Sequence, residues 1–168
     1  MSDIQQSLLA VPQGQLTKDD YYTPKAVFDA LGLEFDLDVC APPGGVPWVP
    51  CRRFFTLEDD GLSQPWEGRV WMNPPYSEVT PWVRRFIDHR HGIALVSHAK
   101  SAWHPKLWEA ADAVAFPFRY FDFVGGSVSL PVWFAAFGDE CVEALSRVGY
   151  VRGVTLSEVA DQFPRGKR

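Results

Sequence analysis

The stretch that decides the fold is Arg69-Val70-Trp71-Met72-Asn73-Pro74-Pro75-Tyr76-Ser77 (RVWMNPPYS). Its first part, residues 69–72, carries large apolar side chains and predicts a short strand. Two consecutive prolines then remove backbone N–H donors, so they end the strand. An amide before the prolines and an aromatic ring after them are not needed for a simple turn. We therefore expect this strand to lead directly into a functional loop.

Predicted helices and strands alternate on both sides of this stretch. Thr23 and Gly32 predict the start and end of a first helix, with Thr23 as its cap. Residues 41–50 hold five prolines and glycines among their first seven positions, which predicts a loop. Apolar spacing predicts the other elements. These are strands at 34–40, 52–56, 93–97, 113–123 and 131–137, helices at 79–87, 105–111 and 142–148, and a tight turn at 125–127.

This order predicts an α/β fold whose sheet is mostly parallel and ends in a late antiparallel hairpin. The chain has 168 residues, of which 46% are hydrophobic, so one domain can bury its own core. We expect a flexible segment at 1–18, a single domain at 19–160 and a basic tail at 161–168. No apolar run approaches membrane length, which predicts a soluble, cytoplasmic protein without a membrane partner.

Composition also limits the chemistry. The three cysteines are odd in number and widely spaced, and the four histidines recur without partners at metal-ligand spacing, so no metal site is predicted. The net charge of −5 argues against a protein that coats nucleic acid nonspecifically, although a local basic face is still compatible with it. The functional site must therefore be sought in the loops that follow the strands.

Ligands of parallel sheets bind beyond the carboxyl ends of the strands. Three predicted strands present polar residues there: Asp38 lies at the end of the first, Asp59 and Asp60 follow the second, and Asn73 follows the third. Carboxylates on neighbouring strand ends can accept hydrogen bonds from an ammonium group and from ribose hydroxyls. This arrangement predicts a nucleoside-like cofactor.

The loop Asn73–Tyr76 suits a different partner. The Asn73 side-chain oxygen and the Pro74 carbonyl can both accept from one amino group, and Pro75 stiffens the turn. Tyr76 offers a flat face on which a base can stack, worth about 1–3 kcal/mol. The loop is therefore predicted to hold an exocyclic amine on a planar heterocycle.

These residues resemble the catalytic motif of DNA methyltransferases that modify amino groups with S-adenosyl-L-methionine (AdoMet). From about residue 19 to 137, the order of motifs is similar to the small phage-type DNA N6-adenine methyltransferases, the phage Dam family. The matching segments are Asp20–Pro24, Phe35–Ala41, Glu58–Leu62 and Asn73–Ser77. The resemblance implies a Rossmann-like methyltransferase fold, AdoMet as cofactor, and double-stranded DNA as partner in a bacterial or phage-infected host cell.

The resemblance also implies roles for single residues. Asn73, Pro74, Pro75 and Tyr76 would be catalytic. AdoMet would be bound by Tyr22, Thr23, Pro24, Asp38, Cys40, Ala41, Asp59 and Asp60, with Asp38 on the methionine amino group. The substrate would contact Tyr76, Ser77, Lys100, Ser101 and Arg119, whereas Arg84 and Arg85 are expected on the solvated face of their helix.

The implied reaction is site-specific transfer of a methyl group to adenine N6. Asn73 and Pro74 would accept hydrogen bonds from the amino group of a flipped base. The nitrogen of that group would then attack the methyl group directly. Which acid contacts the cofactor ribose, the recognition sequence, the oligomeric state and the biological role stay open.

Two alternatives remain. The same motif also serves methylation of other amino nitrogens: RNA adenine or guanine, cytosine N4, or protein glutamine. A noncatalytic AdoMet-binding protein is the second alternative, because residues 38–44 keep only one of the two glycines of the general family motif.

Overall fold

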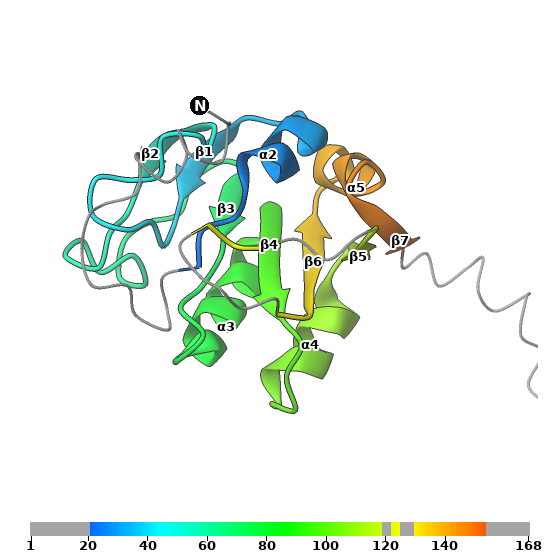
Figure 1. Cartoon of the computed structure of the whole chain (residues 1–168). Coiled ribbons are helices and arrows are strands. Elements are labelled where there is room, and N and C mark those ends of the chain that lie inside the picture. The colour runs from blue at the N-terminus through cyan, green and yellow to red at the C-terminus, as the bar shows by residue number, and fades with distance from the viewer. Residues whose placement is uncertain (1–20, 119–121, 125–129, 154–168) are drawn as a thin grey trace, which may run out of the picture.

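The computed structural model describes residues 21–118, 122–124 and 130–153, which form an α/β domain (Figure 1). Its strands are β1 (Phe35–Asp38), β2 (Cys51–Phe54), β3 (Val70–Met72), β4 (Gly92–Ser97), β5 (Ala113–Pro117), β6 (Val132–Phe137) and β7 (Gly149–Gly153). Its helices are α2 (Lys25–Leu31), α3 (Val79–His89), α4 (Trp103–Ala110) and α5 (Asp139–Leu145). The predicted turn at 125–127, the segment 1–18 and the tail 161–168 lie outside the described residues.

The seven strands form one mixed sheet in the order β2-β1-β3-β4-β6-β5-β7. Strands β2, β1, β3 and β4 pair in parallel, whereas β6 inserts between β4 and β5 and runs antiparallel to both. Strand β7 adds a further antiparallel pair at the edge. The prediction of a mostly parallel sheet is therefore wrong. The antiparallel part is larger than the single predicted hairpin, because β6 is buried along its whole length and pairs with a strand on each side.

Helices cover both faces of this sheet. Figure 1 shows α2 and α5 on one face and α3 and α4 on the other. The strand β3 shows how the sequence builds two cores: Val70 and Met72 pack toward α3 and α4, while Trp71 between them packs against Phe28 and Phe35. Alternation along a strand sends neighbouring side chains to opposite faces. The all-apolar run of β3 therefore reflects a strand that is buried on both sides.

The helix ends differ in detail from the prediction. Gly32 closes α2 in the left-handed conformation, with its N–H on the Phe28 carbonyl, as predicted. The expected Thr23 cap is wrong, because Pro24 occupies the N-cap position and no side chain caps the helix. Helix α3 ends at His89, two residues beyond the predicted 79–87, and its C-cap Arg90 is left-handed at φ 56°. No helix among the described residues is long and apolar enough to span a membrane.

Candidate active site

A pocket of about 380 Å³ opens at the carboxyl ends of β1 and β3. Two of its lining residues, Asp38 and Asn73, come from these strand ends, so the ends of β1 and β3 meet at one edge of the sheet. The other lining residues are Tyr21, Tyr22, Thr23, Cys40, Ala41, Pro42, Pro43, Val46, Val49, Thr56, Leu57, Gly61, Trp71, Pro75 and Trp82. The pocket thus combines a few polar groups with a largely apolar wall, which is the usual composition of a cofactor site.

Asp38 is the buried acid of this pocket, with 4% of its surface exposed. The Cys40 backbone N–H donates to its Oδ1 over 3.2 Å, and no salt bridge from a described residue reaches it. Loss of solvent raises the pKa of Asp38 to about 7, and the bond from Cys40 offsets only part of this effect. A bound cation would favour the ionised carboxylate, so the site is suited to an ammonium group.

Thr23 supplies a second polar group to the same wall. Its hydroxyl oxygen is buried and has no hydrogen-bond partner among the residues that the structure describes. Its backbone carbonyl accepts a hydrogen bond of 2.8 Å from the Trp48 indole, so the 41–50 loop holds the residue in place. A buried polar atom without a partner is costly, and a ligand that bonds to it removes that cost. Thr23 and Asp38 together therefore fit an amino-acid-like ligand end.

The amide of Asn73 is held in a defined orientation. Its Nδ2 donates to the Tyr21 carbonyl over 2.6 Å, and the Tyr76 hydroxyl donates to its Oδ1 over 3.3 Å. The Cys40 thiol also donates to the Asn73 backbone carbonyl over 3.1 Å, joining the ends of β1 and β3. Because an amide oxygen has two lone pairs, Oδ1 can accept a second donor. The side chain therefore presents an acceptor beside the pocket.

Tyr76 lies half-buried in an aromatic cluster. Its ring centroid is 5.6 Å from that of Tyr21 and 6.5 Å from that of Phe123. Burial raises the pKa of Tyr76, so its hydroxyl stays protonated and keeps donating to Asn73. Ser77 follows it on the exposed surface. The cluster joins the segment before α2 to the Asn73–Tyr76 loop.

Comparisons with known proteins identify the family of this chain. Residues 13–138 match the model of the family "DNA N-6-adenine-methyltransferase (Dam)". The chain belongs to this family. A DNA N-6-adenine-methyltransferase of Haemophilus phage HP1 (strain HP1c1) is 40% identical over 76 residues, and the match spans 42% of this chain and 42% of the relative. No solved structure matches the chain.

The structure gathers only part of the site predicted for a Dam family member. Tyr22, Thr23, Asp38, Cys40, Ala41, Asn73 and Pro75 line the pocket, whereas Pro24, Pro74 and Tyr76 are adjacent to lining residues in the chain. Asp59 and Asp60 do not line it, and the Asp59 carboxylate accepts from the Thr56 backbone and hydroxyl instead. Lys100 and Ser101 lie exposed between β4 and α4, and Arg119 lies outside the described residues.

Several lining residues were not predicted from the sequence. Thr56, Leu57 and Gly61 come from the loop after β2, where only Asp59 and Asp60 were predicted to bind the cofactor. Gly61 packs closely, since a Cβ there would lie 2.4 Å from the Val39 carbonyl oxygen. Leu57 is 91% exposed at the same pocket. The sequence offered two signals for these lining residues, a small residue (Gly61) and an apolar residue (Leu57) inside an acidic turn.

Proposed function

We propose that the protein is a DNA methyltransferase that transfers a methyl group from AdoMet to the N6 amino group of adenine. The observation that carries this proposal is the position of the Asn73 amide oxygen at a pocket that also holds Asp38 and Thr23. An acceptor for an amino group thus lies beside groups suited to a cofactor with an ammonium and a carboxylate. The Dam family membership supports the same reaction class.

The residues of the pocket fit AdoMet. The Asp38 carboxylate would accept from the cofactor's ammonium group, and the unpartnered Thr23 hydroxyl would donate to its carboxylate. Val46, Val49 and Trp82 form an apolar part of the pocket wall, which would contact the remaining, flatter part of the cofactor. When bound, AdoMet supplies a methyl group that is activated by its sulfonium. We assign no separate partner for the ribose hydroxyls.

Asn73 would act on the acceptor amine. Its Oδ1 accepts an N–H from the target, which increases electron density on a nitrogen whose lone pair is otherwise delocalised into the ring. The bond from Asn73 Nδ2 to the Tyr21 carbonyl prevents the amide from turning its donor side to the target. Catalysis rests on this orientation and on stabilising positive charge as it develops on the nitrogen. The Pro74 carbonyl is proposed as the second acceptor.

The partner would be double-stranded DNA with the target adenine turned out of the helix. A base buried in a duplex cannot reach Asn73, and extrusion costs a few kcal/mol. Stacking against the aromatic cluster at Tyr76 offsets part of that cost. We place this reaction in the cytoplasm of a bacterial or phage-infected host cell, where such DNA is found.

A transfer assay tests the proposed function. The purified protein is incubated with methyl-labelled AdoMet and either duplex DNA, RNA or protein, and the products are digested and identified. We expect N6-methyladenine in DNA. Label in RNA, in cytosine N4 or in glutamine instead would replace the proposed substrate, and binding of AdoMet without any transfer would identify a noncatalytic homologue.

A further inference from the structure

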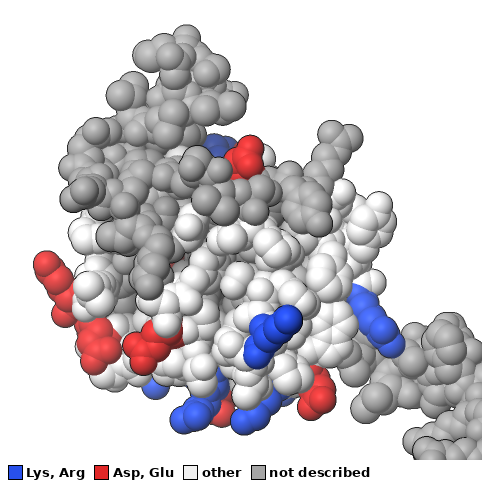
Figure 2. All heavy atoms as spheres, turned by 60° about the horizontal axis from the view of Figure 1, so that its bottom comes forward, with Lys and Arg blue, Asp and Glu red and all other residues white. Residues whose placement is uncertain are grey.

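Charged side chains are unevenly distributed over the surface formed by α3 and α4. Figure 2 brings this end of the molecule forward and shows Lys and Arg side chains toward the lower and right part of the face, whereas acidic side chains gather at the left with a further acidic group at the lower right. The basic side chains stand as separate groups and do not form one continuous basic surface. For the binding of an anionic partner, it therefore matters more which cations are already paired within the protein than that the net charge is −5.

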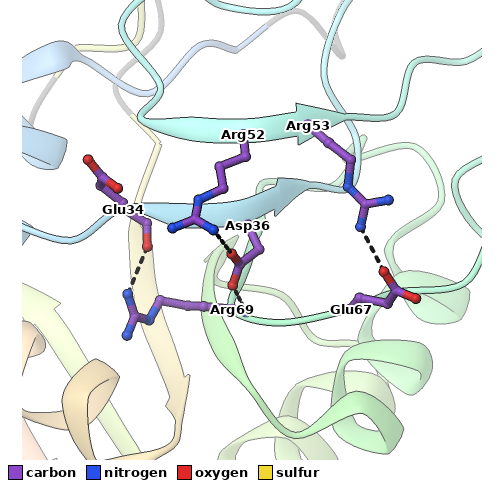
Figure 3. Close-up of polar contacts among 6 residues, drawn as sticks. All are labelled: Glu34, Asp36, Arg52, Arg53, Glu67 and Arg69. Atoms are coloured by element: carbon purple, nitrogen blue, oxygen red, sulfur yellow. Dashed lines mark hydrogen bonds and ion pairs between the residues drawn. The ribbon is translucent and has the colours of Figure 1, made fainter.

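Most of the described cations are neutralised within the protein. Arg52 pairs with Asp36 and Arg53 with Glu67, both around the strands β1 and β2 (Figure 3). Arg69, at the start of β3, donates to the Glu34 carbonyl and pairs with Glu140. Salt bridges also hold Lys25, Arg90 and Arg147, and Arg85 donates to the Gln64 carbonyl while it lies over the Trp66 ring.

Four cations are left without a hydrogen bond or salt bridge within the described part of the chain. These are Arg84, Lys100, Lys106 and Arg152, and each is exposed. Three of them belong to one region: Arg84 is on α3, Lys106 is on α4, and Lys100 is in the loop that leads into α4. Arg152 lies apart on β7, at the edge of the sheet.

A groove of about 430 Å³ lies between α3 and α4. Arg84 lines it from one helix and Lys106 from the other. Its remaining lining residues are Thr80, Val83, Ile87, Asp88, Ala102, Trp103, Glu109 and Ala110. The groove therefore presents two unpaired cations on opposite walls, with an apolar floor between them.

Charge changes sign along this groove. Both helices follow parallel strands, so both begin at the sheet edge that carries the Asn73 loop and run away from it. On α3, Arg84 precedes Asp88 by four residues, or about one turn, and on α4 Lys106 precedes Glu109. The cations thus lie nearer the catalytic edge, and the acids lie further from it. An anionic partner is favoured only at the end closest to Asn73.

We propose that this end of the α3–α4 groove, with Arg84, Lys106 and the neighbouring Lys100, binds the phosphate backbone of duplex DNA beside the target adenine. The inference rests on the proposed function, because it places the DNA on the same edge as Asn73. Exposed cations with no partner in the described part of the chain lose no contact there when they bind phosphate, and they release condensed counterions from the DNA. Phosphate contacts of this kind set the position of the duplex and leave base recognition to other residues.

The acids further along the groove limit how the duplex can lie. Asp88 and Glu109 would repel a backbone that followed the groove along its full length. The duplex is therefore expected to cross the groove near the starts of α3 and α4, which keeps it close to the catalytic loop. An otherwise acidic protein would in this way bind DNA in one place and orientation.

DNA binding at several salt concentrations tests the proposal without relying on catalysis. Binding of a fluorescent duplex is measured for the wild type, Arg84→Gln, Lys106→Gln, Lys100→Gln and the Arg84→Gln/Lys106→Gln double variant. Each lost phosphate contact should lower the slope of log K against log salt by about 0.9, and the double variant should lose about twice that amount. The loss should be the same for unrelated DNA sequences.

Arg152→Gln is the matched control, since it removes a cation that is also exposed and has no partner among the described residues, but lies away from the groove. It should keep the wild-type slope. Unchanged slopes in the groove variants, or an equal loss in Arg152→Gln, would overturn the proposed surface while leaving methylation by the wild type intact. If the wild type transfers no methyl group to DNA and does not bind it, both the surface and the proposed function are rejected.

Discussion

Asn73 is the residue on which the proposed chemistry depends. Asn73→Ala removes the acceptor oxygen and the bond to the Tyr21 carbonyl, but leaves Asp38 and Thr23 in place. We expect kcat for methyl transfer to fall roughly 100-fold or more, as for other residues that stabilise a developing charge. The affinity for AdoMet, measured by calorimetry, should change by less than about threefold. A variant with wild-type kcat would contradict the role of Asn73.

Asp38 makes cofactor binding depend on pH. Its pKa of about 7 means that the carboxylate is protonated in much of the free protein at neutral pH and below. Because an ammonium group binds the ionised form, the affinity for AdoMet should rise as the pH increases from about 6 to 8. Asp38→Asn should weaken binding roughly tenfold or more at pH 8 and remove this dependence. Calorimetry across this range measures both effects.

The same pKa shift predicts how Asp38 affects stability without ligand. The folded-state pKa of about 7 lies above the ordinary value of 3.8, so the group favours the folded state fully below about pH 4. This contribution is lost as the pH rises through 7, at no more than about 1.4 kcal/mol per pH unit. Asp38→Asn should therefore gain stability relative to the wild type between pH 4 and 7, as followed by urea unfolding. A constant difference would show that burial does not shift the pKa of Asp38.

At the scale of elements, the 41–50 loop does more than connect β1 to β2. Trp48 reaches back to the Thr23 carbonyl and so fixes the wall of the pocket. Trp48→Phe keeps an aromatic ring but removes the donor, and the loss of one hydrogen bond of about 1 kcal/mol should weaken AdoMet binding roughly fivefold. Because Asn73 is not affected, kcat at saturating AdoMet should stay within about twofold.

Trp108→Phe is the control for this change. Trp108 packs against Trp133 and Phe116, away from the pocket, and its indole makes no hydrogen bond with a described residue. This variant should bind AdoMet as the wild type does. If both variants bind equally well, the 41–50 loop does not position Thr23 for the cofactor.

Elements were predicted best where the sequence breaks sharply. The strand β3 ends where Asn73 and two prolines begin, and Gly32 ends α2, since proline and glycine act on the local backbone alone. Strand β7 was missed because its five residues are bounded by glycine at both ends and lie at the sheet edge. It is a strand because it pairs with β5, and the paired residues are more than 30 positions apart in the chain.

At the scale of the whole molecule, Arg69 connects parts of the fold that are distant in sequence. It donates to the Glu34 carbonyl before β1 and pairs with Glu140 on α5, and its own side chain is 18% exposed. Arg69→Ala should lower the free energy of unfolding by about 1.5–3 kcal/mol, because it removes a hydrogen bond from a charged donor to the Glu34 carbonyl together with the pair to Glu140. Arg53→Ala breaks an exposed pair with Glu67 and should cost less than about 1 kcal/mol. Urea unfolding compares the two, and equal costs would contradict the connecting role.

Local features of this protein follow from its sequence alone: the strand that leads into Asn73, the proline turn, the apolar run of β3 and the acid at the end of β1. These features depend on backbone conformations and side-chain periods that act over a few residues. Only the tertiary structure decided that β6 enters between β4 and β5, that Thr56 and Gly61 rather than Asp59 line the pocket, and which cations stay unpaired. Those outcomes depend on contacts between segments far apart in the chain, which no local pattern records.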